Sequence, residues 1–296
     1  MSVAAATVER SHYRTEMGRA WYKFSGNKLS VLGLAIVVVV VLLAIFAPLF
    51  APYPAHAGAF VDFANANKAP AAPYWLGTDN VGRDILSRII FSLRSALLMG
   101  MMVLSISVPV GTSMGLLAGY FQGTIIDSII TRITDVFLAV PPLVLALAIA
   151  SMLTPNLTNA MIAISVMWWP WYTRLVYGMA SSLSKEYFVR SAELSGAEWL
   201  HITLRELLPN CVSPILTKMT LDMGLVIMMG ASLSFVGLGE QAPAPALGNM
   251  VSDGAKYMPE QWWMTVFPAL TIMIIVLSFN MLGDGIRDLF ALEDKS

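Results

Sequence analysis

Residues 95–126 read SALLMGMMVLSISVPVGTSMGLLAGYFQGTII and contain no acidic or basic side chain. About 20 helical residues cross a hydrocarbon layer of about 30 Å, so this run is long enough to span a membrane. Further uncharged runs cover 29–61, 136–173, 223–239 and 261–283. The chain of 296 residues is 57% hydrophobic and only 12% charged, with a mean hydropathy of +0.68. Soluble domains carry about 25% charged residues. We therefore predict an all-α membrane protein, and not a soluble helical bundle or a disordered chain.

Six transmembrane helices follow from these runs, because Thr154-Pro155-Asn156 marks a turn that divides the longest of them. They are predicted near 30–51, 95–119, 132–153, 157–178, 213–239 and 263–286. Lys and Arg in short loops remain on the cytoplasmic side of a membrane. With a cytoplasmic N-terminus, thirteen basic residues lie inside and five outside. Both terminal tails, 1–29 and 287–296, are therefore predicted to be cytoplasmic, the connection 52–93 to be periplasmic, and the connection 179–212 to be cytoplasmic.

The first span has a rival interpretation as a cleaved signal peptide. The small residues around His56 resemble a cleavage site after a basic N-terminus and an apolar stretch. The apolar region of a signal peptide is about 7–15 residues long, whereas residues 29–51 are uncharged throughout. We therefore predict a retained membrane anchor.

The sequence contains no pattern for covalent chemistry, nucleotide binding or metal binding. Its only cysteine, Cys211, excludes a disulfide framework and a cysteine-based zinc site. His12, His56 and His201 are scattered, and no G-x-x-x-x-G-K-[ST] run occurs. We therefore predict no catalytic, cofactor-binding or metal-binding residue in this chain.

Three patterns within the spans have both a structural and a functional interpretation. Small residues recur every four positions in the second span, at Gly111, Gly115, Gly119 and Gly123. This spacing predicts a face of close helix packing, although a channel lining on the same face stays open. Lys218 and Asp222 are either a self-neutralising boundary pair or part of a transport path. Residues 168–172 (WWPWY) are either an interfacial aromatic belt, bent at Pro170, or a gate.

The inner connection 179–212 is polar and rich in helix-forming residues, so we expect it to be ordered. Its stretch 186–200 reads EYFVRSAELSGAEWL and predicts an amphipathic surface helix. Phe188, Trp199 and Leu200 protrude from this polar segment. Such groups mark a contact with another protein or rest on lipid headgroups, and the residues alone leave both readings open.

The same segment resembles the EAA loop of ABC importer permeases, whose pattern is E-A-A-x-x-x-G, nine residues and then I-x-L-P. Residues 190–192 stand at the triplet, Gly196 at the glycine, and residues 208–209 at the end. The spacing matches, while Arg190, Ser191 and Glu206 depart from the general pattern, as is typical of the dipeptide/oligopeptide permease subfamily. The resemblance implies a site that couples the chain to an ATPase, formed by Arg190, Ser191, Ala192, Glu193, Gly196, Ala197, Trp199, Leu200, Leu208 and Pro209.

Three further stretches resemble the same subfamily. They are 76–84 (LGTDNVGRD), 233–239 (LSFVGLG) and 280–288 (NMLGDGIRD). The resemblance implies a C-type permease subunit in which residues 94–284 form a type I ABC importer transmembrane domain and 30–51 an extra N-terminal helix.

The resemblance also implies partners and a location in the bacterial inner membrane. The partners would be a second, different permease subunit, two ATPase subunits that carry ATP and magnesium, and a periplasmic or lipid-anchored substrate-binding protein, with membrane lipid around the spans and no nucleic acid. Residues 190–200 would form a coupling helix in a groove of one ATPase, with Ala192 and Gly196 allowing close approach, and 240–263 would receive the solute. Peptides, nickel, glutathione and opines remain candidate solutes. The alternative is a self-contained secondary transporter or channel, for which Asp222 is almost the only candidate coupling residue.

Overall fold

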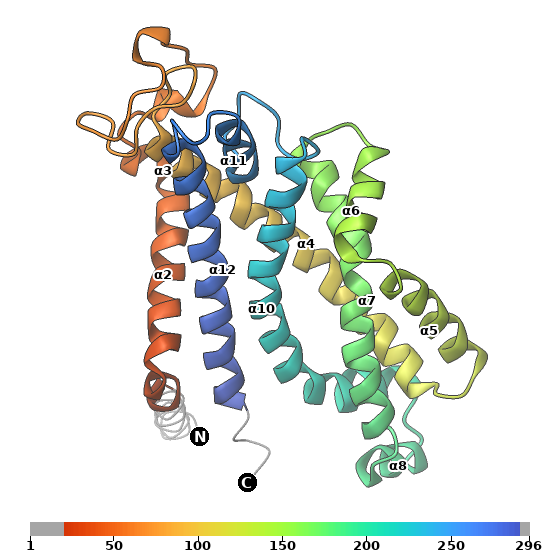
Figure 1. Ribbon diagram of the computed structural model, residues 1–296. Coiled ribbons are helices and arrows are strands. Elements are labelled where there is room, and N and C mark those ends of the chain that lie inside the picture. Colours follow the sequence, from red (N-terminus) through yellow and green to blue (C-terminus); the bar gives the residue numbers. More distant parts are fainter. Residues whose placement is uncertain (1–20, 291–296) are drawn as a thin grey trace.

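The computed structural model describes residues 21–290, and no β-strand forms within this range. Its regular elements are helices joined by short connections, with one longer irregular segment between α3 and α4 (Figure 1). The helices are α2 (Lys28–Ile45), α3 (Ala47–Phe50), η1 (Pro54–Ala57), η2 (Phe63–Asn65), α4 (Ile85–Tyr120), α5 (Ile125–Leu138), α6 (Pro142–Ser151), α7 (Leu157–Leu183), α8 (Tyr187–Leu194), α9 (Trp199–His201), η3 (Ile202–Leu207), α10 (Leu208–Phe235), α11 (Leu247–Ala255) and α12 (Trp263–Phe290).

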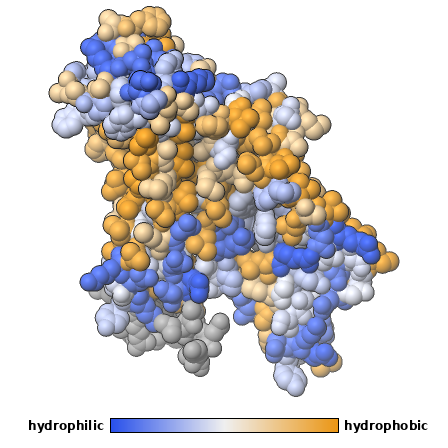
Figure 2. All heavy atoms as spheres, viewed as in Figure 1, coloured by the Kyte–Doolittle hydropathy of each residue, from blue (hydrophilic) through white to orange (hydrophobic). Residues whose placement is uncertain are grey.

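Four helices of the described chain are long and apolar enough to cross a membrane: α2, α4, the continuous helix Trp199–Phe235 that includes α10, and α12. The pair α5 and α6 would make a fifth span, although its two halves are bent by 89°. The predicted span 157–178 corresponds to α7. This helix has 27 residues but is not among the four helices that are apolar enough to cross a membrane. Its Trp, Tyr, Ser and Thr residues and Arg174 lower its mean hydropathy. Figure 2 shows the apolar surface as a band between two hydrophilic ends.

Among the helix boundaries that differ from those predicted from the sequence, two have a clear local cause. The single helix expected at 132–153 is interrupted after α5, because Pro141 and Pro142 lack the N–H groups that a continuing helix would need. The predicted connection 52–93 ends early, since α4 begins at Ile85. Asp84 caps this helix by accepting hydrogen bonds from the Ser87 N–H at 2.8 Å and the Ser87 hydroxyl at 2.6 Å.

The glycines of the second predicted span pack α4 against α7. A Cβ atom on Gly111, Gly115 or Gly119 would come within 2.4–2.7 Å of atoms of α7. The predicted close packing is therefore confirmed for these three. It is wrong for Gly123, which lies beyond the end of α4 and donates its N–H to the Asp127 carboxylate. Gly123 forms the turn into α5.

The long helices pack around α4, which crosses the bundle and contacts α2, α7 and α10 (Figure 1). α4 packs along α7, and α12 packs between α2 and α10. Gly33 of α2 lies so close to α12 that a Cβ there would be 2.7 Å from the Met281 Cβ. α2 begins, and α12 ends, at the end of the bundle that carries α8. Most of the predicted tails, residues 1–20 and 291–296, lies outside the described residues.

The segment between α3 and α4 covers the opposite end of the bundle (Figure 1). The Trp263 indole at the start of α12 donates a hydrogen bond to the Thr78 carbonyl at 3.2 Å. The Nδ1 atom of buried His56 accepts the Asp84 N–H at 2.9 Å, and its ring stacks on Phe60 with centroids 4.0 Å apart. Burial lowers the pKa of His56. These contacts fix the segment, hereafter the outer layer (51–84), to the ends of α4 and α12.

Candidate functional site

α8 is a short helix that projects from one end of the bundle (Figure 1). Its side chain Val189 is fully buried, and Ala192 and Ala197 pack against the core while partly exposed. The Tyr120 hydroxyl at the end of α4 donates a hydrogen bond to Glu193 at 3.1 Å. One face of α8 is thereby held against the rest of the protein, and the other face is left for solvent or a partner.

A Schellman motif ends α8. The Ala197 N–H donates to the Ala192 carbonyl, and the Gly196 N–H donates to the Glu193 carbonyl, both at 3.0 Å. Gly196 has φ of +84°, in the left-handed region that favours glycine. No atom of the described chain lies within 4 Å of a Cβ built on Gly196, so within this chain the backbone conformation, and not contact with a neighbour, favours glycine. The predicted single helix over 186–200 is therefore wrong, because the chain turns at 195–198 before α9.

The outward face of α8 carries two large apolar side chains. Tyr187 is 88% exposed and Leu194 is 90% exposed. With Ser191 they occupy positions i, i+4 and i+7, which share one face of a helix. The sequence prediction included Ser191 but missed Tyr187 and Leu194, although this spacing could have identified them. Exposed apolar side chains of this size on a polar segment indicate a contact surface.

The other predicted coupling residues lie at three places. Arg190 is exposed on α8, and Trp199 and Leu200 are about half exposed in α9, where the Trp199 ring lies 5.9 Å from that of Phe121. Residues 208–209 lie at the start of α10, beyond η3, and are not part of the α8 face.

A π-helical turn, η3, connects α9 to α10 without a break. The Leu208 N–H bonds to the carbonyl of Thr203, five residues earlier, and Ile202 and Leu207 are fully buried. Pro209 follows directly, where its missing N–H falls within the widened turn. The helix from Trp199 to Phe235 is therefore continuous, and Figure 1 shows it turning as it enters α10.

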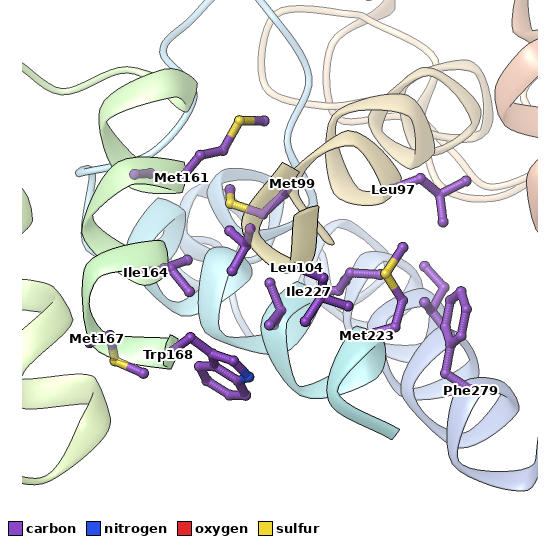
Figure 3. Packing of buried hydrophobic residues seen from close by; sticks show 14 of the residues in the cluster. Leu97, Met99, Leu104, Met161, Ile164, Met167, Trp168, Met223, Ile227 and Phe279 are labelled. Carbon is purple, nitrogen blue, oxygen red and sulfur yellow. The ribbon is translucent and has the colours of Figure 1, made fainter. Parts of the chain in front are cut away.

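A buried polar node joins α7 to α10, and it consists of Trp168, Lys218 and Asp222. Asp222 is 2% exposed and accepts hydrogen bonds from the Trp168 indole at 2.9 Å and the Lys218 ammonium at 3.0 Å. The ammonium lies 5.9 Å from the ring centroid of Trp171 and 5.4 Å from that of Tyr172. Figure 3 shows Trp168 projecting from α7 toward α10. The predicted pairing of Lys218 with Asp222 is therefore confirmed, and the bond from Trp168 shows that the carboxylate also joins α10 to α7.

The outer loop between α10 and α12 contains α11, which packs on both helices. Glu240 is half buried in a recess with Ser92 and Ser234, between the ends of α4 and α10. Burial raises the pKa of the Glu240 carboxyl. The loop predicted to receive solute therefore contains the helix α11 and begins with a half-buried acidic side chain, Glu240.

Within residues 21–290, no group of three His, Cys, Asp or Glu side chains is placed to hold a metal ion. The arrangement consists of long apolar helices around a buried polar node, with an exposed apolar face on α8 at one end. These features are typical of a membrane-embedded protein with an exposed surface for contact with another molecule.

Comparison with known protein families identifies the kind of membrane protein to which this chain belongs. The model for "Binding-protein-dependent transport system inner membrane component" matches residues 111–292, more than half of the chain. A second model, "N-terminal TM domain of oligopeptide transport permease C", matches residues 15–70. The chain therefore belongs to the family of binding-protein-dependent transport system inner membrane components, and it is a permease subunit of an ABC importer. The predicted resemblance is confirmed, and the alternative of a self-contained secondary transporter is wrong.

Named relatives and one solved structure agree with this family. The chain is 41% identical to the dipeptide transport system permease protein DppC of Alkalihalophilus pseudofirmus, over 93% of this chain and 89% of the relative. It is 38% identical to the probable D,D-dipeptide transport system permease protein DdpC of Escherichia coli K12, over 90% and 89%. It is also 38% identical to the glutathione transport system permease protein GsiD of Escherichia coli O6:K15:H31, over 99% and 95%. An inward-facing structure of the MetNI methionine ABC transporter matches with a TM-score of 0.52 and 18% identity, covering 68% of this chain and 95% of that chain, and it supports the fold.

Proposed function

We propose that this chain is the C-type permease subunit of an importer for short peptides, and that it forms the path with a second, different permease subunit. The peptide assignment is supported by the two relatives named as dipeptide permeases. The proposed topology has six spans, with α7 as the fourth, in the bacterial inner membrane. Both termini and α8 face the cytoplasm in this topology, because thirteen of the 18 basic residues then lie on that side.

Two ATPase subunits, which bind ATP and magnesium, would attach on the cytoplasmic side, and one would receive α8. The observation that carries this proposal is the outward face of α8, where Tyr187 and Leu194 are almost fully exposed. A groove that covers both side chains would remove their apolar area from water and stabilise the complex. Of the residues predicted for this role, Arg190 and Ser191 lie within reach of the same contact.

Closure of the ATPase dimer would move α8 as a rigid body and carry α10 with it, because α9, η3 and α10 form one helix. Packed helix interfaces switch between discrete arrangements. A small movement of α8 and α10 can therefore convert the inward-facing state of the importer to the outward-facing state. A periplasmic or lipid-anchored binding protein would dock on the outer layer and deliver the peptide past residues 240–263. Hydrolysis itself belongs to the ATPase subunits.

Co-purification with the ATPases tests the docking surface. The double variant Tyr187→Ser, Leu194→Ser removes both apolar side chains without altering the buried contacts of α8. We expect the ATPase recovered with the solubilised permease to fall about tenfold, which corresponds to about 1.4 kcal/mol of binding. Trp75→Ser is a matched control, since Trp75 is 74% exposed in the outer layer. Equal ATPase recovery from the double variant and the control would contradict the proposal.

Labelling with a membrane-impermeant thiol reagent tests the orientation. A cysteine at exposed Glu198 should react in inverted vesicles and not in intact cells, whereas one at Phe63 in the outer layer should show the reverse. Reaction of the Glu198→Cys variant in sealed intact cells would place α8 outside and overturn the topology.

A further inference from the structure

The polar node between α7 and α10 has an open side. Both carboxylate oxygens of Asp222 are already bonded, one to the Trp168 indole and both to Lys218. The Lys218 side chain is 26% exposed, and within residues 21–290 its ammonium bonds only to Asp222. An ammonium group has three N–H donors. At least one donor of Lys218 is therefore available to another acceptor while the pair with Asp222 persists.

Lys218 faces a cavity of about 540 Å³ between α10 and α12. Pockets that hold small molecules fall in the range of about 300–1,000 Å³. The polar side chains that line the cavity are Ser213, Thr217, Lys218, Asp222 and Arg287. Two cations and one carboxylate give the lining a net positive charge, and the two hydroxyls can donate further hydrogen bonds.

A second groove beside α10 gives a direct comparison. It has a volume of about 600 Å³ and is lined by apolar side chains of α4, α10 and α12, together with Ser105 and Thr220. No charged side chain lines it. Thr220 lies one helical turn from Thr217 on the same helix, so the two positions differ mainly in the charge of the space that they face.

We propose that Lys218 and Arg287 form a carboxylate-binding site in the charged cavity, and that it takes the C-terminal carboxylate of a short peptide during transport. A carboxylate that enters here approaches existing positive charge, and Asp222 stays neutralised by its bonds to Trp168 and Lys218. An uncharged groove of the same size would leave the carboxylate desolvated and unpaired. The inference deepens the proposed function and rests on it.

Charge-selective labelling tests the cation site independently of transport. In the assembled importer in membrane vesicles, the Thr217→Cys variant is treated with anionic or with cationic methanethiosulfonate, and each rate is divided by that of free cysteine. We expect the anionic reagent to react about fivefold faster or more, since two nearby cations attract it. Cys211 is fully buried, and the unmodified chain provides the blank.

Three variants show whether the selectivity comes from the named cations. Lys218→Gln should bring the ratio of the two rates close to one. Arg287→Gln should lower it while leaving the Lys218–Asp222 pair intact, which covers the case that Lys218→Gln misfolds. Thr220→Cys, in the apolar groove, should show a ratio near one in every background. Equal rates at Thr217→Cys, or no reaction with either reagent, would overturn the site.

Protection by a defined peptide tests the ligand. Dialanine added to the cytoplasmic side of inverted vesicles should slow the anionic labelling of Thr217→Cys, and its C-terminal amide should not. Protection by both compounds or by neither refutes the carboxylate assignment. If labelling responds instead to replacing phosphatidylcholine with phosphatidylglycerol, the cavity binds a lipid phosphate and the inference is wrong. Failure of the ATPases to co-purify would refute the proposed function, whatever the labelling ratio, so the two failures are distinguishable.

Discussion

Substitutions at Gly196 should impair coupling according to backbone preference and not according to side-chain size. Gly196 has φ of +84°, and the two hydrogen bonds of 3.0 Å that end α8 depend on that conformation. For an L-residue this conformation costs about 1–2 kcal/mol. No contact within the described part of the chain adds to this cost, because none of its atoms lies within 4 Å of a Cβ at this position. A penalty of this size raises the fraction of molecules with a disrupted end of α8 about 5–30-fold.

The assay is the amount of solute imported per ATP hydrolysed, measured in proteoliposomes that contain the complete importer and its binding protein. Asparagine enters the left-handed region more readily than other non-glycine residues. We therefore expect the ratio to fall in the order Gly196 wild type, Gly196→Asn, Gly196→Ala, Gly196→Val, with a loss of about fivefold for alanine. Membrane insertion and expression should stay unchanged, because α8 lies outside the spans.

The relative coupling of the Gly196→Ala and Gly196→Asn variants distinguishes a requirement for backbone conformation from a requirement for a small side chain. Alanine is smaller than asparagine, so if Gly196 serves to let a partner approach closely, Gly196→Ala would be the better tolerated of the two. Alanine outperforming asparagine, or a Gly196→Val variant with wild-type coupling, would refute the reasoning from the Schellman motif.

Three further substitutions have controls within the chain. Gly111→Ala should lower the free energy of unfolding by about 1–3 kcal/mol through overpacking against α7, whereas Gly178→Ala, with nothing within 4 Å of its Cβ, should not; equal values in a detergent unfolding titration would contradict this. Trp168→Phe removes a donor from buried Asp222 and should cost about 1–3 kcal/mol, while Trp171→Phe should be neutral; a silent Trp168→Phe in the same titration would argue against the node. Burial lowers the pKa of His56 in the folded protein, so below about pH 6.5 the unfolded chain binds a proton at this histidine more readily than the folded chain does. The free energy of unfolding is therefore unaffected by His56 above about pH 6.5 and falls as the pH drops below that value. The thermal midpoint should therefore decrease between pH 7.5 and 5.5 in wild type and less in His56→Asn, and parallel pH profiles would refute the role of His56.

Apolar runs and turn residues predicted most of the helical architecture, because burial in lipid demands uncharged helices of a fixed length. A closely packed face on α4 was also predictable, since glycines at 111, 115 and 119 admit a neighbouring backbone closely, but the spacing did not identify α7 as the neighbour. The 89° bend between α5 and α6 was missed. Its signal, Pro141-Pro142, is present in the sequence, but the hydropathy of the run outweighed it in the prediction.

The candidate site was predicted as a segment but not in its details. The family pattern located Gly196, and the position of a glycine after an amphipathic stretch could have indicated that it ends a helix. The bond from Trp168 to Asp222 joins residues 54 positions apart. No local pattern specifies such a pairing, because it depends on how α7 and α10 rotate against each other when they pack.

The unbroken helix that turns between η3 and α10 has the shape of a lever with two unequal arms. Its short arm, residues 199–207, ends beside α8, and its long arm, the 28 residues of α10, reaches the opposite face of the bundle. At about 1.5 Å per residue the arms measure about 13 and 42 Å, a ratio of about three. A push of about 2 Å at the short arm would then swing the far tip of α10 by about 6 Å, enough to displace a side chain from its neighbour. On this geometry, a small displacement beside α8 would produce a larger one at the far end of α10.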